Sequence, residues 1–215
     1  MKYLIVTGGE IPDEFAAKVV MMGGFEVIMA ADIGMEFLYR AKIQPDIIVG
    51  DFDSADPEIL DYFRSQEQID ICMLPSEKDD TDTEFAIREA ISRGAKEITI
   101  LGATGTRLDH VLGNIALLGI GLESDVRIEL LDPHNRIRMI DKPFTLRKDE
   151  QYGKYLSLIS FSDQVTGVSI TGVKYPLSDY TMGGFNSLGV SNEIVDEEAK
   201  ISLTSGRLLV VESRD

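Results

Sequence analysis

A regular alternation of short apolar segments and amphipathic segments is the feature that most limits how this chain can fold. The apolar segments are rich in β-branched residues and are often apolar on both faces, as parallel strands covered on both sides must be. They lie at 3–6, 26–31, 46–50, 69–74, 97–102 and 126–131, and the helix-like segments between them lie at 12–22, 35–41, 57–64, 82–93 and 108–118. Strands that alternate with helices predict a doubly wound α/β sheet.

The character of the sequence changes near Asp132 and Pro133. Beyond this point we expect no helix, and short alternating segments separated by turn residues predict antiparallel strands. These segments lie at 136–140, 155–161, 165–171, 199–204 and 207–211. The segment 180–198 has little periodicity, and long loops of this kind are often binding loops. We therefore predict a Rossmann-like, mostly parallel α/β domain over residues 1–132 and a small antiparallel β-sandwich over residues 133–215.

The net charge of the chain limits the classes of molecule that it can bind. With a net charge of −16, we expect it to bind neither nucleic acids nor anionic membranes, because both are bound through lysine and arginine. No apolar stretch is long enough to span a membrane, and we expect no signal peptide. The one cysteine, Cys72, fits a reducing cytoplasm. An acidic chain that handles phosphates usually needs a metal ion to bridge the two negative partners.

Two aspartates directly follow the segment 46–50. Ligands of open α/β sheets bind at the carboxyl ends of strands, so Asp51 and Asp53 lie where chemistry is expected. In an extended continuation of the strand both side chains point the same way, and both can reach one Mg²⁺ ion, which prefers oxygen ligands. The alternative is that Asp53 or Ser54 begins a turn. Asp56, which precedes a proline, is expected to cap the next helix.

A second acidic cluster precedes a helix-like segment. Asp79, Asp80 and Asp82 crowd together, and a cation would relieve their mutual repulsion. The same stretch fits a capping box formed by Thr81 and Glu84, and acidic residues in a first helical turn complement the helix dipole. Metal binding and capping both stay open for this cluster.

A glycine-bearing loop at 102–107 precedes another helix-like segment. Exposed backbone N–H groups at a helix start suit a phosphate, and Arg107 adds a fork of donors. The loop is neither a Walker P-loop nor a dinucleotide fingerprint, and His110 is explained equally well as a partly exposed helical histidine. Asp32, at another strand end, can meet a ribose hydroxyl or cap a helix. Together these loops predict metal-assisted transfer of a phosphate-containing group.

Several linked motifs resemble those of the thiamine pyrophosphokinase family, in the same order over nearly the whole chain. In the first part they are Gly-Asp-Phe-Asp-Ser at 50–54, Lys-Asp-Asp-Thr-Asp at 78–82, and Gly-Ala-Thr-Gly at 102–105 with Arg-Leu-Asp-His at 107–110 and Asn114. In the second part they are Gly-Val-Lys-Tyr-Pro-Leu at 172–177, Gly-Val-Ser-Asn-Glu at 189–193 and Gly-Arg-Leu-Leu-Val at 206–210. The resemblance implies an α/β domain for ATP, a β-sandwich for thiamine, and a homodimer with active sites between subunits.

The resemblance also implies roles for single residues. Mg²⁺ and the ATP phosphates would be held by Asp51, Asp53, Asp79 and Asp82, and Arg107 would contact phosphate. The catalytic residues would be Asp51, Asp53, Asp82 and Arg107. The ATP site would further include Asp32, Thr81, Thr104 and Gly105, and the thiamine pocket would include Asp109, Ser191 and Asn192.

The chain departs from the family pattern at two positions. Ile33 stands where the family often has glycine, and isoleucine disfavours a positive φ. Thr106 stands where a second glycine often precedes Arg-Leu-Asp-His. We expect the thiamine hydroxyl to attack the β-phosphorus of ATP in line, with AMP leaving. The competing hypotheses are a phosphatase with Asp51 as nucleophile and a non-catalytic sensor of nucleotide or thiamine.

Overall fold

The computed structural model describes residues 1–75, 80–183 and 187–215. The chain divides into two compact units, Met1–Pro133 (unit 1) and His134–Asp215 (unit 2). None of the helices in the described residues is long and apolar enough to cross a bilayer.

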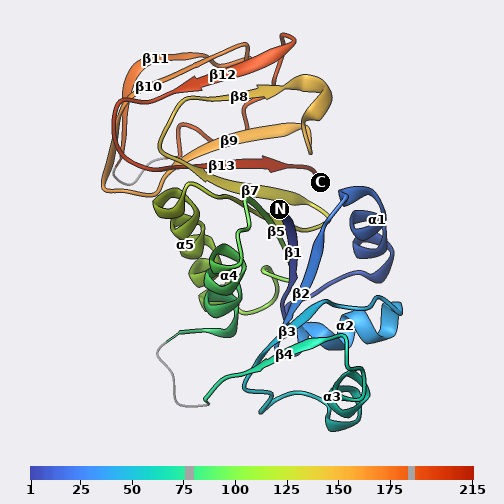
Figure 1. Cartoon of the computed structure of the whole chain (residues 1–215). Helices are drawn as coiled ribbons and strands as arrows, with labels where there is room; N and C mark the ends of the chain where they lie inside the picture. The colour runs from blue at the N-terminus through green and yellow to red at the C-terminus, as the bar shows by residue number, and fades with distance from the viewer. Residues whose placement is uncertain (76–79, 184–186) are drawn as a thin grey trace. The chain divides into compact units, whose positions relative to one another are not determined.

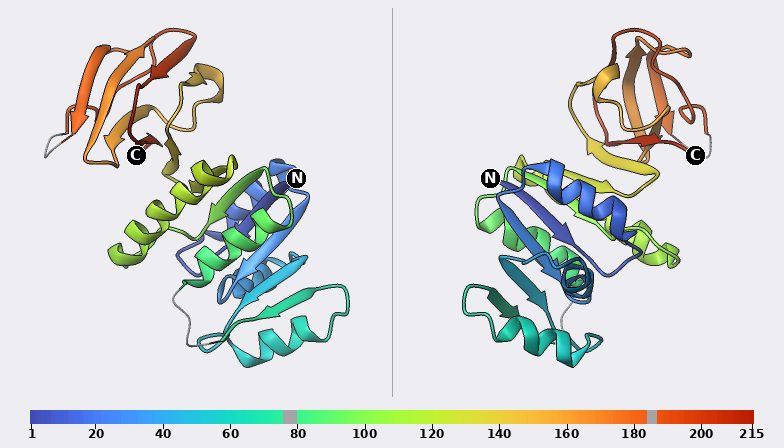
Figure 2. Two further views of the ribbon diagram at one scale, coloured as in Figure 1. Left: turned by 60° about the vertical axis from the view of Figure 1, so that its left-hand side comes forward. Right: turned by 90° about the vertical axis from the view of Figure 1, so that its right-hand side faces the viewer.

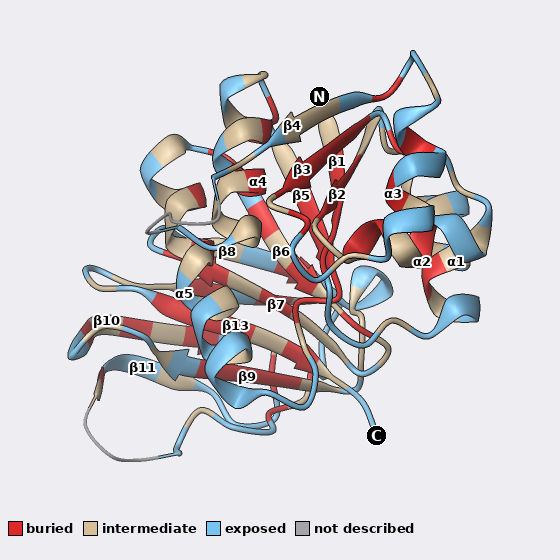
Figure 3. Cartoon of the chain, turned by 90° about the horizontal axis from the view of Figure 1, so that it is seen from below, coloured by how far each residue is buried: buried red, intermediate tan, exposed pale blue. Residues whose placement is uncertain are grey.

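Unit 1 is built on a parallel sheet with the strand order β4-β3-β2-β1-β5-β6 (Figure 1). The strands are β1 (Lys2–Val6), β2 (Val27–Ala31), β3 (Ile47–Gly50), β4 (Asp70–Met73), β5 (Glu97–Leu101) and β6 (Arg127–Leu131). Each neighbouring pair in this order runs parallel. The central strands are almost entirely buried, as parallel strands covered on both faces must be (Figure 3). The predicted doubly wound α/β sheet is therefore confirmed.

Helices cover both faces of this sheet. They are α1 (Asp13–Gly23), α2 (Gly34–Ala41), α3 (Pro57–Arg64), α4 (Asp82–Ser92) and α5 (Leu108–Ser124). Helices α1, α2 and α3 lie on one face, and α4 and α5 lie on the other (Figures 1 and 3). The strand order reverses between β1 and β5, so the loops that leave these two strands lead to opposite faces. A crevice opens at such a reversal, and it is where open α/β sheets bind their ligands.

Two helix starts behave as the sequence predicts. The Oδ1 atom of Asp56 accepts a hydrogen bond from the N–H of Glu58 at 2.9 Å, with proline at the first helical position of α3. The Oγ1 atom of Thr81 accepts from the N–H of Glu84 at 3.2 Å, and so caps α4. The carboxylate of Glu84 pairs with Arg88 one turn further on.

Helix α5 extends beyond its expected end at residue 118. Glycine inside a helix is unfavourable, but Gly121 is required here by packing. A Cβ atom on Gly121 would lie 2.6 Å from the carbonyl oxygen of Val126 and 2.8 Å from Cγ1 of Ile128. The helix ends only at Asp125, which adopts a left-handed conformation with φ of 53°.

Unit 2 is an antiparallel β structure. Its elements are β7 (Asn135–Ile140), β8 (Phe144–Arg147), the short 3-10 turn η1 (Lys148–Glu150), β9 (Tyr155–Ser160), β10 (Gln164–Thr171), β11 (Leu177–Gly183), β12 (Glu198–Ser202) and β13 (Leu208–Ser213). Strands β7, β13 and β9 form one layer, and β11, β10, β12 and β8 form the other (Figure 2). Buried side chains from both layers, among them Leu158, Leu208, Val168 and Ile201, form one core. The predicted β-sandwich is confirmed.

The sequence did not reveal β8 and β11. Strand β8 is only 4 residues long, too short to show an alternating pattern. Strand β11 lies at the edge of its sheet and is exposed along most of its length, so it lacks the buried alternation by which strands are found. The start of the expected loop 180–198 therefore belongs to β11.

Candidate active site

A cavity of 470 Å³ opens in unit 1 at the carboxyl ends of β1, β2 and β5. Its walls come from the loop after β1, the turn after β2, the starts of α4 and α5, and the loop after β5. The lining residues are 7–10, 31–33, Ser54, 81–83, 102–107, His110, Val111 and Asn114. Of the residues expected to bind ATP, the cavity brings together Asp32, Thr81, Asp82, Thr104, Gly105 and Arg107.

The loops after β1 and β5 are in direct backbone contact. The N–H of Gly9 donates to the carbonyl oxygen of Gly102 at 2.9 Å, and Oγ1 of Thr7 donates to the same oxygen at 2.6 Å. A Cβ atom on Gly9 would overlap that oxygen, and Gly102 has a φ of 73°. Only glycine permits this close approach. The sequence prediction missed the loop after β1, although Gly8-Gly9 directly after a strand was the available signal.

The loop after β5 leads into α5 with its backbone exposed. Arg107 is the N-cap of α5, and its guanidinium, which has no acceptor atom, forms no cap hydrogen bond with the described residues. The amide of Asn114 donates to the carbonyl oxygen of Ala103 at 2.8 Å and ties the loop to the second turn of the helix. In the first turn the N–H of His110 already donates to Oδ1 of Asp109 at 3.0 Å. The first N–H groups of a helix attract anions. This part of the cavity is therefore suited to a phosphate.

Arg107, which lines the cavity, forms a bidentate ion pair with Asp109. Their contacts are Nε–Oδ1 at 3.2 Å and Nη2–Oδ2 at 2.5 Å, and both side chains are about two-thirds exposed. Hydrogen bonding to Arg107, helped by the N–H of His110, lowers the pKa of Asp109 to about 2. Asp109 is therefore ionised throughout the neutral range. It does not itself line the cavity.

The chain turns directly after β3, so the prediction that it continues in an extended conformation there is wrong. Phe52 has a φ of 63° and is 8% exposed, with its ring in the core of unit 1. Burying this ring requires the chain to turn sharply between the two aspartates. Oδ1 of Asp51 accepts from the N–H of Asp53 at 3.2 Å, while Asp53 itself is exposed. Ser54 reaches the cavity, whereas neither aspartate is among its lining residues.

Asp32 occupies a left-handed position beside the end of β3. Its φ is 49°, and its Cα atom would lie 3.1 Å from a Cβ atom on Gly50. The N-cap of α2 is Ile33, so of the two interpretations of Asp32 the one as a helix cap is wrong. Ile33 has a φ of −60°. The positive φ of this turn falls on the aspartate, and isoleucine is accommodated without strain.

The carboxylates expected to bind metal are only partly assembled. Within the described part of the chain, no group of three or more histidine, cysteine, aspartate or glutamate side chains is placed to hold a metal ion. Asp79 lies outside the described residues. Mg²⁺ is commonly held by one or two carboxylates together with substrate phosphates and water. Of the expected donors, Asp82 lines the cavity, whereas Asp51 and Asp53 do not, so an ion at this cavity would take most of its ligands from phosphate and water.

Unit 2 has a smaller cavity of 350 Å³, lined in part by Tyr175, Leu188 and Asn192. The side chain of Asn192 is buried and is used within the protein. Its Oδ1 accepts from the N–H groups of Tyr175 and Glu193, and its Nδ2 donates to the carbonyl oxygen of Tyr175 at 2.8 Å. Ser191 precedes it with a φ of 61°, and its N–H donates to Oγ of Ser157. Asn192 therefore shapes the wall that presents Tyr175.

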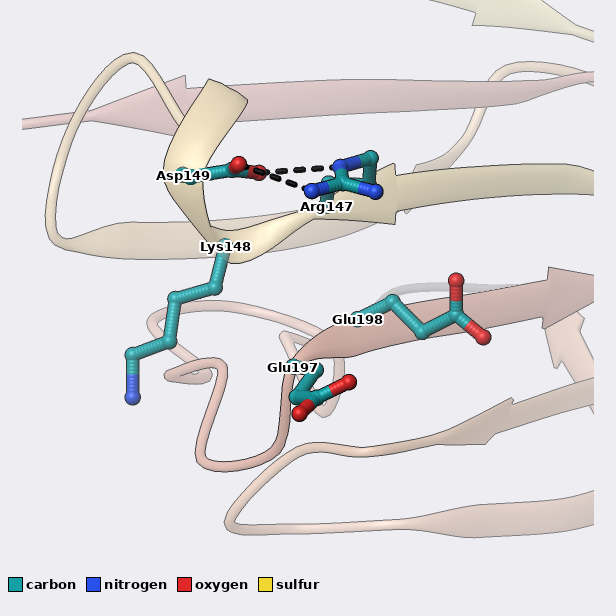
Figure 4. A pocket seen from close by; sticks show the side chains of 5 residues that line it. All are labelled: Arg147, Lys148, Asp149, Glu197 and Glu198. Atoms are coloured by element: carbon teal, nitrogen blue, oxygen red, sulfur yellow. Dashed lines mark hydrogen bonds and ion pairs between the residues drawn. The ribbon is translucent and has the colours of Figure 1, made fainter.

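A third hollow, of 520 Å³, lies at the end of β8 and is lined only by charged residues (Figure 4). Arg147 there is already paired with Asp149, at 3.0 Å and 2.8 Å, and Lys148 points away from that pair. Glu197 and Glu198 complete the lining. The side chains do not converge on one point, so this hollow is not a candidate active site.

Known proteins resemble the chain over most of its length. The model of the thiamin pyrophosphokinase catalytic domain matches residues 21–130, and that of the thiamin pyrophosphokinase vitamin B1 binding domain matches residues 143–208. The thiamine pyrophosphokinase of Bacillus subtilis (strain 168) is 33% identical over 188 residues, 87% of each chain.

Solved structures agree with these matches. A crystal structure of thiamine pyrophosphokinase from Bacillus subtilis superposes with a TM-score of 0.88 at 31% identity, and covers 100% of both chains. One of a thiamin pyrophosphokinase family protein from Enterococcus faecalis superposes with a TM-score of 0.85 at 30% identity, again over 100% of both chains.

Proposed function

Since the chain belongs to the thiamine pyrophosphokinase family, we propose that the cavity of unit 1 is the site where its reaction takes place. The activity is the transfer of pyrophosphate from ATP to the hydroxyl of thiamine, which gives thiamine diphosphate and AMP. One observation carries the assignment of the site. Two glycine-bearing loops, two helix starts and Arg107 converge on a single cavity at the reversal of strand order.

Within this cavity we assign the ATP phosphates to the loop at Thr104 and Gly105, the start of α4 at Thr81, and Arg107. Backbone N–H groups and a guanidinium fork are suited to phosphate oxygens. Asp32, beside the end of β3, is assigned to the ribose.

Mg²⁺ is the proposed cofactor, held by Asp51, Asp53 and Asp82 together with Asp79. When bound, the ion would neutralise charge on the phosphate oxygens. Asp51, Asp53, Asp79 and Asp82 would hold the ion, and Arg107 stabilises the charge that develops on the transferred group.

We assign thiamine to Asp109 and to the region of Ser191 and Asn192. Thiamine carries a positive charge, and the net charge of −16 on the chain favours its approach. The ionised carboxylate of Asp109 is bound to Arg107. A phosphate that draws Arg107 away would free Asp109 for the thiamine pyrimidine.

The function is tested by incubating the protein with ATP, Mg²⁺ and thiamine. AMP and thiamine diphosphate are expected in equal amounts, and a chelator that removes Mg²⁺ is expected to stop both. A phosphatase would release phosphate without thiamine, and a sensor would bind both ligands without forming AMP. Either result would contradict the proposal.

We further propose a homodimer, with the cytoplasm as its compartment. The exposed face of α5 supports the dimer, because Leu108 and Leu112 are 72% and 65% exposed there and such apolar surface usually marks an interface. Sedimentation equilibrium is expected to give twice the chain mass, and Leu112→Asp is expected to shift the protein toward the monomer. A monomeric wild type would refute the dimer, whereas Met21→Asp, at an exposed site on α1, serves as the control.

A further inference from the structure

We propose that Ile33 determines nucleotide specificity in the unit 1 cavity, because its side chain provides the apolar surface on which the base of the nucleotide packs. This inference deepens the proposed function and rests on it. It concerns the turn after β2, where Ile33 follows Asp32 and precedes α2.

Ile33 lies directly over Gly8, across from the loop after β1. A Cβ atom on Gly8 would overlap Cγ1 of Ile33 and would lie 2.6 Å from its Cδ1. Both residues line the cavity. The nearest atoms to such a Cβ all belong to Ile33, so the space above Gly8 is filled by this one side chain. Ile33 and Gly8 are therefore a matched pair that forms one wall.

The rest of the lining leaves few alternatives for the base. Among the described residues that line the cavity, only Ile33 and Val111 carry apolar side chains larger than alanine. Val111 lies one turn into α5, where its N–H donates to the carbonyl oxygen of Arg107, at the end assigned to phosphate. Ile33 adjoins Asp32, the residue assigned to the ribose. A nucleotide whose phosphates face Arg107 and whose ribose meets Asp32 would place its base against Ile33.

A β-branched side chain suits this task. Its first torsion has few allowed states, so the wall above Gly8 is stiff and little entropy is lost when a flat ring packs on it. The gain scales with the apolar area covered. A large purine ring therefore benefits more than a smaller pyrimidine.

The test measures the dissociation constants of ATP and of inorganic tripolyphosphate, both with Mg²⁺, in Ile33→Ala. ATP is expected to bind about tenfold more weakly, because several buried methyl and methylene contacts are lost. Tripolyphosphate, which has no base, is expected to bind as in wild type. The preference for ATP over CTP is expected to fall. Ile59→Ala serves as the matched control, since Ile59 is half-buried on α3 and does not line the cavity.

A second pair of variants tests the wall itself. Gly8→Ala is expected to weaken ATP binding, because the new methyl group displaces the Ile33 side chain. Adding Ile33→Ala should make Gly8→Ala harmless, so that the double variant binds ATP as Ile33→Ala does. In that background the two closest atoms, Cγ1 and Cδ1 of Ile33, are absent, and the Cβ atom of residue 33 lies at 3.8 Å, an ordinary contact. Thermal melting of each variant shows whether the fold is kept.

An unchanged dissociation constant for ATP in Ile33→Ala would overturn the inference. An equal weakening of the binding of ATP and of tripolyphosphate would also overturn it, because it would place Ile33 at the phosphates. The proposed function fails differently. If the wild type binds ATP but forms no AMP in the presence of thiamine, the reaction at this site is refuted, while the binding comparison at Ile33 still decides the inference.

Discussion

Arg107→Ala is expected to lower kcat/KM roughly 10²- to 10³-fold while leaving the fold intact. The loss follows from removing a charged donor placed where negative charge develops during transfer. The fold should survive because the side chain is 68% exposed and its ion pair with Asp109 is a surface pair of the kind that contributes little to stability. Steady-state kinetics at saturating thiamine, with thermal melting in parallel, measure both quantities.

The chain contains a close structural match for this experiment. Arg147 also forms a bidentate ion pair with an aspartate two residues further on, Asp149, with Nε–Oδ1 at 3.0 Å and Nη2–Oδ2 at 2.8 Å. Its side chain is 61% exposed. It lies in the charged hollow of unit 2 (Figure 4). Arg147→Ala therefore removes the same kind of ion pair away from the cavity and should leave kcat/KM unchanged. Equal losses in both variants would show that the effect at Arg107 is not specific to the site.

Arg107→Lys separates charge from geometry. Lysine keeps the positive charge but cannot present two parallel donors to a phosphate. We expect partial activity, intermediate between Arg107→Ala and wild type. Replacing Arg107 removes the main cause of the lowered pKa of Asp109, which then returns toward its ordinary value of 3.8. This carboxylate stays ionised near neutral pH, so its titration does not alter the comparison.

The fold of unit 1 was largely predictable because its signals are local. Apolar runs, a cap at Asp56 and a cap at Thr81 each specify an element without reference to the rest of the molecule. The prediction of unit 2 was less complete, since the edge strand β11 is mostly exposed and has no buried face from which to infer it. The length of α5 depended on the packing of Gly121 against Val126 and Ile128, which is a tertiary contact.

The candidate site was predictable in its location but not in its detail. Strand-end reasoning identified the residues that do line the cavity, such as Asp32, Asp82 and Arg107. It did not predict the conformation of the chain at Asp51, because the direction of that side chain depends on where the Phe52 ring is buried. It also overlooked the loop at Gly8, because the contacts of the two glycines there are made with other loops and leave no pattern in one segment. Local patterns identify donors, whereas packing decides where they point.

Asp51→Asn is expected to lower kcat roughly 10²-fold or more, with an increased requirement for Mg²⁺. Asparagine has nearly the same shape, and its oxygen can still accept the hydrogen bond that the N–H of Asp53 donates to Oδ1 of Asp51. The turn around Phe52 should therefore be kept. The negative charge is lost, and with it a ligand of the kind that Mg²⁺ prefers.

A titration of activity with Mg²⁺ measures both effects, and Asp61→Asn is the matched control, since Asp61 is 77% exposed on α3 and pairs only at the surface with Arg64. The control should match wild type in kcat and in its requirement for Mg²⁺. A reduced kcat in Asp51→Asn with an unchanged Mg²⁺ requirement would assign Asp51 to a direct role on the substrate. Full activity would remove it from the mechanism, and the ion would then have to be held from the side of Asp82, which lines the cavity from the first turn of α4.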